Sequence, residues 1–400
     1  MRIICDENIP LAGDAFGPLG DVRCLPGRAI AREDVMQADA LIVRSVTRVD
    51  QALLDGSPVR FVGTATIGTD HVDTAWLASR SIAFASAAGC NSLAVVQWAI
   101  AALLELTARQ SGDDPDAPWN TGPLGIVGQG NIGRPLAQLA NALGWKLMLC
   151  DPPRQAAGEQ PTVGSRWCSL REIAEHAHAV TFHVPLTRHG GHPTFHMVDA
   201  AILRTMQQRG VLLLNAARGE VIATEVLQQA LASQHGGKQP WALDVFEGEP
   251  APAPDVIARA AIATPHIAGY SLEGKLNGTR MMLEALLASP LGRSAPVRTE
   301  AVWQPKFNPP PAGVLAAPTA CNGWRAQVRM AVRQMYDVVA DSNQLKACAG
   351  ITETPQRARH FDDLRKHYPH RREFSAWSLP TGDGFAPEAR EALAAMMAQR

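Results

Sequence analysis

The stretch that decides the fold is Gly125-Ile126-Val127-Gly128-Gln129-Gly130-Asn131-Ile132-Gly133. It places the pattern G-x-G-x-x-G directly after an apolar run that is typical of a buried strand. In this pattern Gly128 allows a tight turn, Gly130 lets the backbone approach a pyrophosphate, and Gly133 permits close packing of the following helix. The free amides at the start of that helix would bind phosphate groups. The stretch predicts a dinucleotide-binding Rossmann turn, with Asn131 and Ile132 beside the cofactor.

The residues after this turn indicate which dinucleotide binds. A helix is expected over 135–143 and a strand over 146–150, and that strand is followed by Asp151. An acid at about this distance from the turn binds the ribose hydroxyls of NAD and disfavours the additional phosphate of NADP. Arg154 favours NADP, but the two prolines before it are expected to direct it outward. NAD is therefore the predicted cofactor. The alternative is a glycine turn without a ligand, with Asp151 on the surface.

Short β-rich runs alternate with helical patterns along most of the chain, which is typical of parallel α/β folding. The first unit is expected to contain strands over 2–5, 40–44, 60–64 and 82–86. A long helix should follow from Asn91 or Ser92, because apolar residues recur at three- and four-residue spacing. A second α/β unit is expected from 124 to about 264, and a helix over 273–287 could return to the first sheet. The proline-rich 305–318 predicts a linker, and the remainder of the chain predicts a small separate domain.

The composition limits the classes of function. With 400 residues and 46% hydrophobic residues, the chain can bury large cores, and its length favours two or three domains. A formal net charge of -1 gives no electrostatic reason to expect nucleic acid or an anionic membrane as a partner. The best candidate for a membrane span, 93–106, is interrupted by Gln97 and Glu105. The N-terminus turns polar too early for a signal peptide, so a cytoplasmic protein is expected.

The cysteines and other metal-binding residue types give no pattern of ligands. The seven cysteines are scattered and lack a Cys-x-x-Cys pair, so neither a disulfide framework nor a zinc site is expected. No metal is predicted.

Three ionisable residues, Arg218, Glu249 and His266, follow the glycine-rich turn in the order that a particular chemistry requires. Hydride transfer to or from a hydroxy acid needs a guanidinium to bind the carboxylate bidentately. It also needs an imidazole to move the hydroxyl proton, and a carboxylate to orient and charge that imidazole. The chain supplies one of each, in loops after apolar strands.

Each of these roles has an alternative. His266 could be a loop histidine with satisfied hydrogen bonds, although its order with Arg218 and Glu249 favours catalysis. His183 also lies at a strand end near the expected cofactor site, but it lacks a paired acid, which favours a structural part. Glu247 is the rival to Glu249 as the acid that orients the imidazole.

With these motifs, the chain resembles the D-isomer-specific 2-hydroxyacid dehydrogenases over roughly residues 1–290. The segments that match the family as a whole are the glycine turn, Asp151, His183-Val184-Pro185-Leu186-Thr187, 215–219, 244–250 and His266. Matches to one subfamily, which acts on a phosphorylated hydroxy acid, continue along the whole chain. They are 6–10, 43–47, 62–66, 68–73, 88–91, 266–270, 361–366 and 371–374.

The resemblance assigns roles to individual residues. It implies that Arg218, Glu249 and His266 are catalytic, with His266 as the proton donor in the reductive direction. It also implies substrate contacts from Ser45, Thr66 and Tyr270. The NAD contacts that it implies are Asp151, Val184, Ala216, Ala217, Arg218, Asp244 and Gly269. Val184 stands where the subfamily often has Thr, so any contact there must come from backbone or methyl packing.

The resemblance also implies an architecture: two Rossmann-like parallel-sheet domains and a small C-terminal α+β domain. Residues 1–93, completed by 267–300, would form the substrate domain, 94–266 the NAD-binding domain, and 305–400 a dimerisation domain that makes a homodimer. The basic run 357–372 is expected to be a solvated helical face. Its alternative role is recognition of the substrate phosphate, delivered into the partner's cleft, with Arg44 as the nearest other candidate.

Together these features predict an NAD-dependent enzyme with a small-molecule substrate, a phosphorylated 2-hydroxy acid. A dehydrogenase for a different phosphorylated hydroxy acid is the nearer alternative. A non-catalytic scaffold that senses NADH is the more distant one, because fold does not fix function.

Overall fold

The computed structural model of the protein describes residues 1–233, 239–294, 303–318, 323–369 and 371–399. It divides the chain into two compact units, which we describe separately. The first unit contains residues 1–92 and 271–310, and the second contains residues 93–270 and 311–400.

The first unit is a five-stranded parallel sheet in the order β2-β1-β3-β4-β5. Its strands are β1 (Arg2–Asp6), β2 (Asp21–Leu25), β3 (Ala40–Val43), β4 (Phe61–Thr64) and β5 (Ala83–Ser86). Its helices are α1 (Ala12–Phe16), α2 (Arg32–Val35), α3 (Gln51–Leu54), α4 (Thr74–Ser79), α12 (Leu272–Ala288) and α13 (Pro290–Ser294). Four strands lie where the sequence predicts them. The prediction missed β2, because its mostly exposed side chains give no apolar run.

Both faces of this sheet are buried. Along β3, Ala40 and Ile42 belong to the core under α1 and α12, whereas Leu41 and Val43 belong to the core under α2, α3 and α4. This alternation follows from the two-residue period of a strand. The helix predicted over 273–287 is α12, and it packs on β4 and β5 of the first sheet, as expected.

The second unit is a seven-stranded parallel sheet in the order β12-β11-β10-β9-β6-β7-β8. Its strands are β6 (Leu124–Val127), β7 (Leu147–Cys150), β8 (Ser165–Trp167), β9 (Ala179–Phe182), β10 (Leu212–Asn215), β11 (Gln239–Leu243) and β12 (Ala260–Ala263). Its helices before residue 270 are α5 (Ser92–Gln110), α6 (Gly133–Ala142), α7 (Pro152–Ala156), α8 (Leu170–His176), α9 (Ala200–Gln208), α10 (Thr224–Ala232) and α11 (Pro254–Arg259). The predicted α/β class with two parallel sheets is confirmed.

The strand order of the second sheet reverses between β6 and β9, which pair with each other although β7 and β8 lie between them in sequence. In open parallel sheets, ligands bind at the carboxyl ends of the strands beside such a switch point. The glycine turn follows β6, and Val184 follows β9, so both lie at this point.

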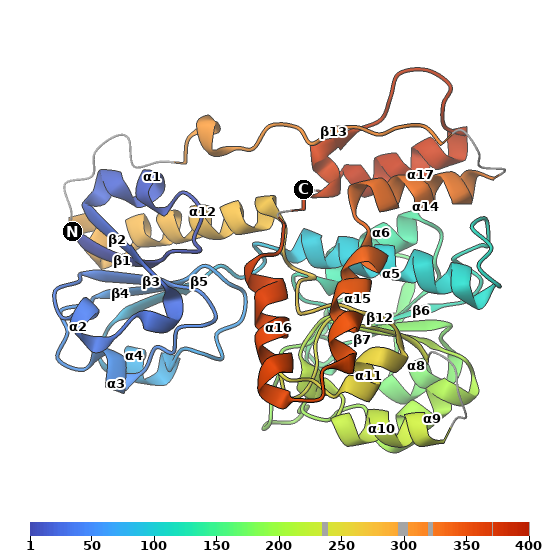
Figure 1. The fold of residues 1–400 in the computed structure, drawn as a ribbon, viewed down its shortest axis with the longest axis horizontal. Helices are drawn as coiled ribbons and strands as arrows, with labels where there is room; N and C mark the ends of the chain where they lie inside the picture. The colour runs from blue at the N-terminus through green and yellow to red at the C-terminus, as the bar shows by residue number, and fades with distance from the viewer. Residues whose placement is uncertain (234–238, 295–302, 319–322, 370, 400) are drawn as a thin grey trace. The chain divides into compact units, whose positions relative to one another are not determined.

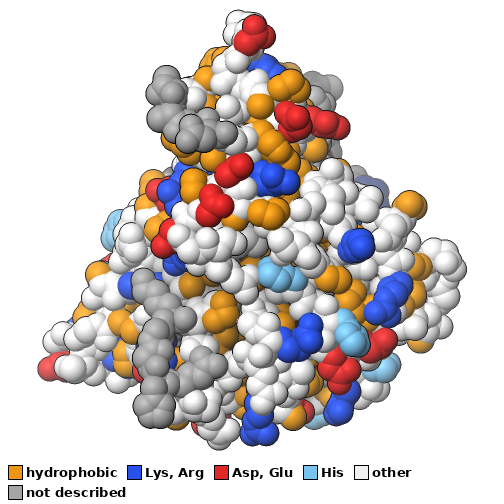
Figure 2. All heavy atoms as spheres, turned by 90° about the vertical axis from the view of Figure 1, so that its right-hand side faces the viewer, with side chains coloured by type: hydrophobic (Ala, Val, Ile, Leu, Met, Phe, Trp, Pro, Cys, Tyr) orange, Lys and Arg blue, Asp and Glu red, His pale blue; other side chains and the backbone are white. Residues whose placement is uncertain are grey.

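Helix α5 is the core helix of the second unit (Figure 1). Among the described residues it alone is long and apolar enough to cross a membrane, yet 83% of that stretch is buried inside the protein. On the face drawn in Figure 2, positive and negative side chains lie interspersed.

Residues 311–400 lie in the same compact unit as the seven-stranded sheet, and the separate domain expected at 305–400 stays a prediction. They form α14 (Trp324–Met335), α15 (Val338–Ala347), α16 (Thr354–Lys366), α17 (Pro387–Met397) and the short parallel pair β13 (Gly313–Val314) and β14 (Trp377–Ser378). Side chains of α14 and α17 share one hydrophobic core with α5 and α6 (Figure 1). The segment is therefore held to the NAD-binding sheet by a common core rather than only by a linker.

Polar contacts also join this C-terminal segment to the sheet. Strand β12 lies at the edge of the sheet, where its backbone groups lack a strand partner. Ser342 on α15 accepts a hydrogen bond from the amide of Ala263 at 3.0 Å, and Lys346 donates one to the carbonyl of Ala261 at 2.7 Å. On α14, Arg333 forms an ion pair with Glu105 of α5. These contacts cover the edge of β12 and hold α5.

The shared core makes a prediction about stability. Leu393 on α17 is completely buried in this core. Leu393→Ala should lower the free energy of unfolding of the second unit by about 2–5 kcal/mol, because it leaves a cavity. Glu391→Ala, at an exposed position of the same helix, should change it by less than about 0.5 kcal/mol. Urea unfolding monitored by NADH binding would measure both. An unchanged midpoint for Leu393→Ala would indicate that the C-terminal segment folds independently.

Candidate active site

The three predicted catalytic residues lie in loops after adjacent strands of the second sheet. Arg218 follows β10, Glu249 follows β11 and His266 follows β12, and these strands are neighbours in the order β12-β11-β10. Because the strands are parallel, their carboxyl ends meet at the same edge. The fold brings the loops that carry the guanidinium, the carboxylate and the imidazole to one edge of the sheet.

His266 and Glu249 form a hydrogen-bonded pair. The Nδ1 of His266 lies 2.8 Å from Oε2 of Glu249, and the other carboxylate oxygen accepts the amide of Phe246 at 2.9 Å. Burial alone would raise the pKa of Glu249, but the charge of His266, these hydrogen bonds and the charge of Arg365 together lower it. Glu249 is therefore ionised at neutral pH. An ionised carboxylate accepts the Nδ1 proton, which leaves Nε2 of His266 to exchange a proton with a substrate.

The loop that carries His266 is fixed by the buried carboxylate of Asp244. That carboxylate accepts hydrogen bonds from the hydroxyl of Thr264 at 2.6 Å and from the amides of Ile267 and Ala268, both at 2.9 Å. Burial is the largest influence on Asp244 and raises its pKa. His266 has a φ of 56°, in the left-handed region that few non-glycine residues adopt. Its amide donates to the carbonyl of Asp244 at 2.7 Å, which holds this conformation.

Arg218 lies in a loop that packs directly on the loop of Glu249. A side chain at Gly219 would overlap the backbone of Phe246 and Glu247, so the two loops are in close contact there. Asn215 orders the turn, because its side chain accepts from the amide of Ala217 and donates to the carbonyl of Arg218, both at 3.0 Å. Arg218 is half-buried, which suits a cation that meets a substrate carboxylate.

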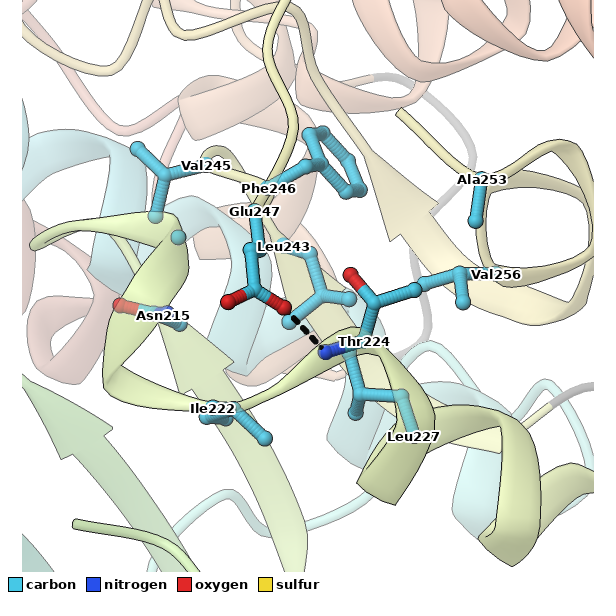
Figure 3. A pocket seen from close by; sticks show the side chains of 11 residues that line it. Asn215, Ile222, Thr224, Leu227, Leu243, Val245, Phe246, Glu247, Ala253 and Val256 are labelled. Atoms are coloured by element: carbon cyan, nitrogen blue, oxygen red, sulfur yellow. Dashed lines mark hydrogen bonds between the residues drawn. The ribbon is translucent and has the colours of Figure 1, made fainter. Parts of the chain in front are cut away.

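Glu247 has a different task from that of Glu249. It accepts a hydrogen bond from the amide of Thr224 at 2.7 Å, at the start of α10, and its other oxygen lies 2.7 Å from Nε2 of His196. Figure 3 shows its carboxylate directed at that amide, in a pocket of only about 10 Å³. The structure thus pairs His266 with Glu249 and not with its rival.

The glycine turn fits a dinucleotide. A side chain at Gly128 would overlap the carbonyl of His183, and one at Gly133 would overlap the carbonyl of Gly128. Above Gly130 the space is open, which leaves room for a phosphate group. Asp151 lies beside the turn, because it accepts the amide of Gln129 at 2.8 Å. The residues present therefore fit NAD, with Asn131 and Ile132 between Gly130 and α6.

A family model described as the D-isomer specific 2-hydroxyacid dehydrogenase, NAD binding domain, matches residues 111–268. The chain is 44% identical to an erythronate-4-phosphate dehydrogenase of Marinobacter nauticus, over 94% of each chain. It is 41% identical to one of Escherichia coli, over 96% of each chain. The chain belongs to the erythronate-4-phosphate dehydrogenase family. This confirms the predicted family, and with it an NAD-dependent 2-hydroxyacid dehydrogenase.

The C-terminal segment and the fold have matches of their own. A model described as a domain of unknown function (DUF3410) matches residues 310–395. Among solved structures, D-lactate dehydrogenase from Aquifex aeolicus, complexed with NAD and lactic acid, is 22% identical. It covers 72% of this chain and 95% of its own, with a TM-score of 0.60. This likeness shows a common fold.

The structure corrects the prediction for Arg154. Its amide donates to Asp151, and its guanidinium lies 3.6 Å from the same carboxylate and 2.9 Å from Glu159. It therefore does not point outward. Because two carboxylates already neutralise its charge, Arg154 is a poor partner for the additional phosphate of NADP.

The remaining predicted cofactor residues line the same edge of the sheet. A side chain at Gly128 would lie 3.0 Å from Cγ1 of Val184, so that residue packs on the turn. Ala216 and Ala217 are buried in the loop after β10, and Gly269 follows the Asp244-bound amides. Both carboxylate oxygens of Asp244 hold the His266 loop, and its contact with NAD stays a prediction.

His183 has the surroundings of a structural residue. Its Nε2 lies 2.9 Å from the hydroxyl of Thr181, and burial lowers its pKa to about 3. The ring is therefore neutral at physiological pH, and none of the described acids forms an ion pair with it.

The basic run 357–372 is a solvated face only in part: Arg359 and Lys366 are exposed, but other members of the run are enclosed. Arg357 is buried and donates to the carbonyl groups of Pro252 and Ile351 at 3.1 and 2.8 Å. Arg371 is half-buried and donates to the carbonyl of Ala94 at 2.6 Å. Arg365 reaches Tyr270, one of the predicted substrate residues. Sequence reasoning missed these contacts because the residues that they join are far apart in the chain.

Two predicted substrate residues, Ser45 and Thr66, lie in the first unit. Ser45 is in the turn after β3, and Thr66 follows β4, where its hydroxyl lies 2.8 Å from that of Thr64. Lys275, on α12 of the same unit, was not predicted. Burial and then the charge of Arg44 lower its pKa to about 8. Two cations thus influence each other in the unit that carries Ser45.

The pairing of His266 with Glu249 makes a prediction about pH. Glu249→Gln removes the charge that stabilises the protonated imidazole, so the acidic limb of the kcat/KM profile for hydroxy-acid oxidation should move to lower pH, while the maximum rate falls. Glu247→Gln is the matched control, and it should leave the limb in place. Initial rates over a range of pH would measure both profiles. If the acidic limb shifted in Glu247→Gln but not in Glu249→Gln, the pairing of His266 with Glu249 would be refuted.

The ion pairs around Asp151 make a prediction about cofactor choice. The native protein should bind NADH at least tenfold more tightly than NADPH, about the effect of one lost charged hydrogen bond. The double variant Asp151→Ala with Glu159→Gln removes both ion-pair partners of Arg154. The ratio of NADH affinity to NADPH affinity should then fall or reverse. Fluorescence titration with both reduced cofactors gives the two affinities. Equal affinities in the native protein would contradict the assignment of Asp151.

Proposed function

We propose that this protein oxidises 4-phospho-D-erythronate at C2 to (R)-3-hydroxy-2-oxo-4-phosphooxybutanoate with NAD, as a step in the biosynthesis of pyridoxine 5'-phosphate, a form of vitamin B6. The observation that carries the proposal is the hydrogen bond of 2.8 Å between His266 and Glu249, beside the loop of Arg218 and on the same sheet edge as the glycine turn. The names of relatives that are 41–44% identical over almost the whole chain support the substrate.

His266 is the proton acceptor for the C2 hydroxyl. Its Nδ1 is held by Glu249, so the unshared electron pair of the neutral ring lies on Nε2. As the hydroxyl loses its proton to Nε2, the imidazole becomes positive, and the ionised Glu249 stabilises that charge. In the reverse direction the same nitrogen returns the proton to the carbonyl oxygen.

Arg218 binds the substrate carboxylate and polarises the developing carbonyl oxygen at C2. A guanidinium suits both tasks, because its planar fork matches a carboxylate and keeps its charge at any physiological pH. NAD, when bound, supplies the acceptor for the C2 hydride. The chain's contribution is to hold hydroxyl and carboxylate in fixed positions at the carboxyl edge of the sheet.

The substrate phosphate requires cationic or amide donors. We propose Arg44 and Lys275 of the first unit for this task, together with the turn that contains Ser45. Support comes from the lowered pKa of Lys275, which burial and the nearby Arg44 produce. A phosphate between two such cations would relieve their repulsion. Ser45, Thr66 and Tyr270 complete the proposed substrate contacts.

We further propose a cytoplasmic homodimer. The family typically assembles in this way, and a net charge of -1 suits a protein without an anionic macromolecular partner.

The proposed function is tested by initial rates with NAD and a panel of 2-hydroxy acids that includes 4-phospho-D-erythronate and 3-phosphoglycerate. The first should give the highest kcat/KM. His266→Ala should reduce kcat about 10²–10⁴-fold, the range for a general acid-base group, while NADH binding survives because the glycine turn is unchanged. A higher kcat/KM for 3-phosphoglycerate would show that this acid, and not 4-phospho-D-erythronate, is the substrate. Retention of NADH binding without turnover of any acid would favour a cofactor-sensing scaffold.

A further inference from the structure

The loop from His266 to Tyr270 is held at two points by arginines of the C-terminal segment. Arg371 donates to the carbonyl of Ala268, in the middle of the loop. Arg365, on α16, donates from Nη2 to the hydroxyl of Tyr270 at 3.4 Å, at the end of the loop. The residues matched by the domain of unknown function therefore reach the loop that carries the catalytic imidazole.

The two arginines have different surroundings. Arg371 is half-buried, and its guanidinium stacks 3.9 Å from the ring centre of Tyr336, so it packs as a structural clamp. The side chain of Arg365 keeps 18% of its exposed area, and its ion pair with Asp362 spans 4.0 Å. The charge of Glu249 also acts on Arg365. Arg365 thus carries its charge near the acid of the proposed acid-base pair.

We propose that Arg365 is a positioning residue for the acid-base pair, which fixes the hydroxyl of Tyr270 and places a positive charge near Glu249 of its own chain. The inference rests on the proposed function and gives the C-terminal segment a role in catalysis. A basic residue delivered by a partner subunit is not needed for this role, because Arg365 and Tyr270 belong to the same unit of one chain.

The charges around this pair fix the sign of the expected effect. Glu249 is influenced by His266 and Arg365, and Arg365 by Tyr270, Glu249 and Asp362. The positive charge of Arg365 helps to lower the pKa of Glu249. Removal of this charge favours the protonated forms of both members of the His266–Glu249 pair, because one nearby cation is lost. The acidic limb of the activity profile would then move upward, opposite to the shift expected for Glu249→Gln.

The test uses the full-length protein with 4-phospho-D-erythronate and NAD. Arg365→Met should lower kcat/KM about tenfold or more, as expected for loss of a charged hydrogen bond, and should move the acidic limb to higher pH. Arg365→Lys should keep the limb near its native pH, because it keeps the charge. Arg359→Met is the matched control, because Arg359 is exposed on the same helix, and it should behave as the native protein. NADH affinity and Tm should be unchanged in all three.

A double-mutant cycle of Arg365→Met and Tyr270→Phe supplies a second test. Tyr270→Phe removes the same hydrogen bond and should raise KM without moving the acidic limb. In the Arg365→Met background, Tyr270→Phe should raise KM no further, because the hydrogen bond that it removes is already lost.

The outcomes separate this inference from the proposed function. A native protein that does not oxidise the substrate would overturn both. A native protein that is active, with Arg365→Met equal to Arg359→Met in rate and pH profile, would overturn the role of Arg365 alone. Additive effects of Arg365→Met and Tyr270→Phe on KM would show that the two side chains act independently, and would also overturn it.

Discussion

The structure of the candidate site depends on one buried carboxylate, that of Asp244. A carboxylate removed from water is costly unless its oxygens accept hydrogen bonds. Here the loop after β12 supplies them, from a hydroxyl and two amides, and the hydroxyl of Thr264 also accepts a hydrogen bond from the indole of Trp98 on α5 at 3.0 Å. The carboxylate therefore ties the end of β11 to the end of β12 and to the core helix. His266 lies within this tied loop, which explains how a non-glycine residue keeps a positive φ.

The parallel sheet explains why the other functional loops lie at the same edge. Strands β10, β11 and β12 each end where the loop of one proposed hydride-transfer residue begins, so residues that are far apart in sequence share one edge. The C-terminal segment also contacts β12 and these loops. Ser342 and Lys346 bind backbone groups of β12, Arg357 donates to a carbonyl of the Glu249 loop, and Arg371 donates to a carbonyl of the His266 loop. Catalytic groups need such support, because small displacements reduce the effective concentration of reacting groups.

The sequence predicted the features that have a local signature. The glycine spacing around Gly128, the acid at Asp151 and the apolar strands each depend on residues within about one βαβ unit, so they could be read directly. The sequence also predicted that Arg218, Glu249 and His266 lie in loops after strands. The carboxyl ends of parallel strands lie at the same edge of a sheet, which brings these loops together. The choice of Glu249 over Glu247 needed the structure, which shows Glu247 bound at the start of α10.

The features that the sequence did not reveal depend on contacts between distant residues. Strand β2 is too polar to show an apolar pattern. The ion pairs of Arg154 join it to Glu159 across a turn, and Arg365 meets Tyr270, which lies 95 residues earlier in the chain. The membership of residues 311–400 in the second unit follows from a core shared by α5 and α17, and no local pattern encodes which core an amphipathic helix joins.

The central claim is that His266 is oriented through Nδ1 by Glu249. The most direct test is proton NMR of the downfield imidazole N–H signals in the native protein and in two variants. An N–H proton held by an ionised carboxylate is protected from exchange and shifted downfield. We predict one such signal that Glu247→Gln retains and that both Glu249→Gln and His266→Ala abolish. Its persistence in Glu249→Gln would contradict the account.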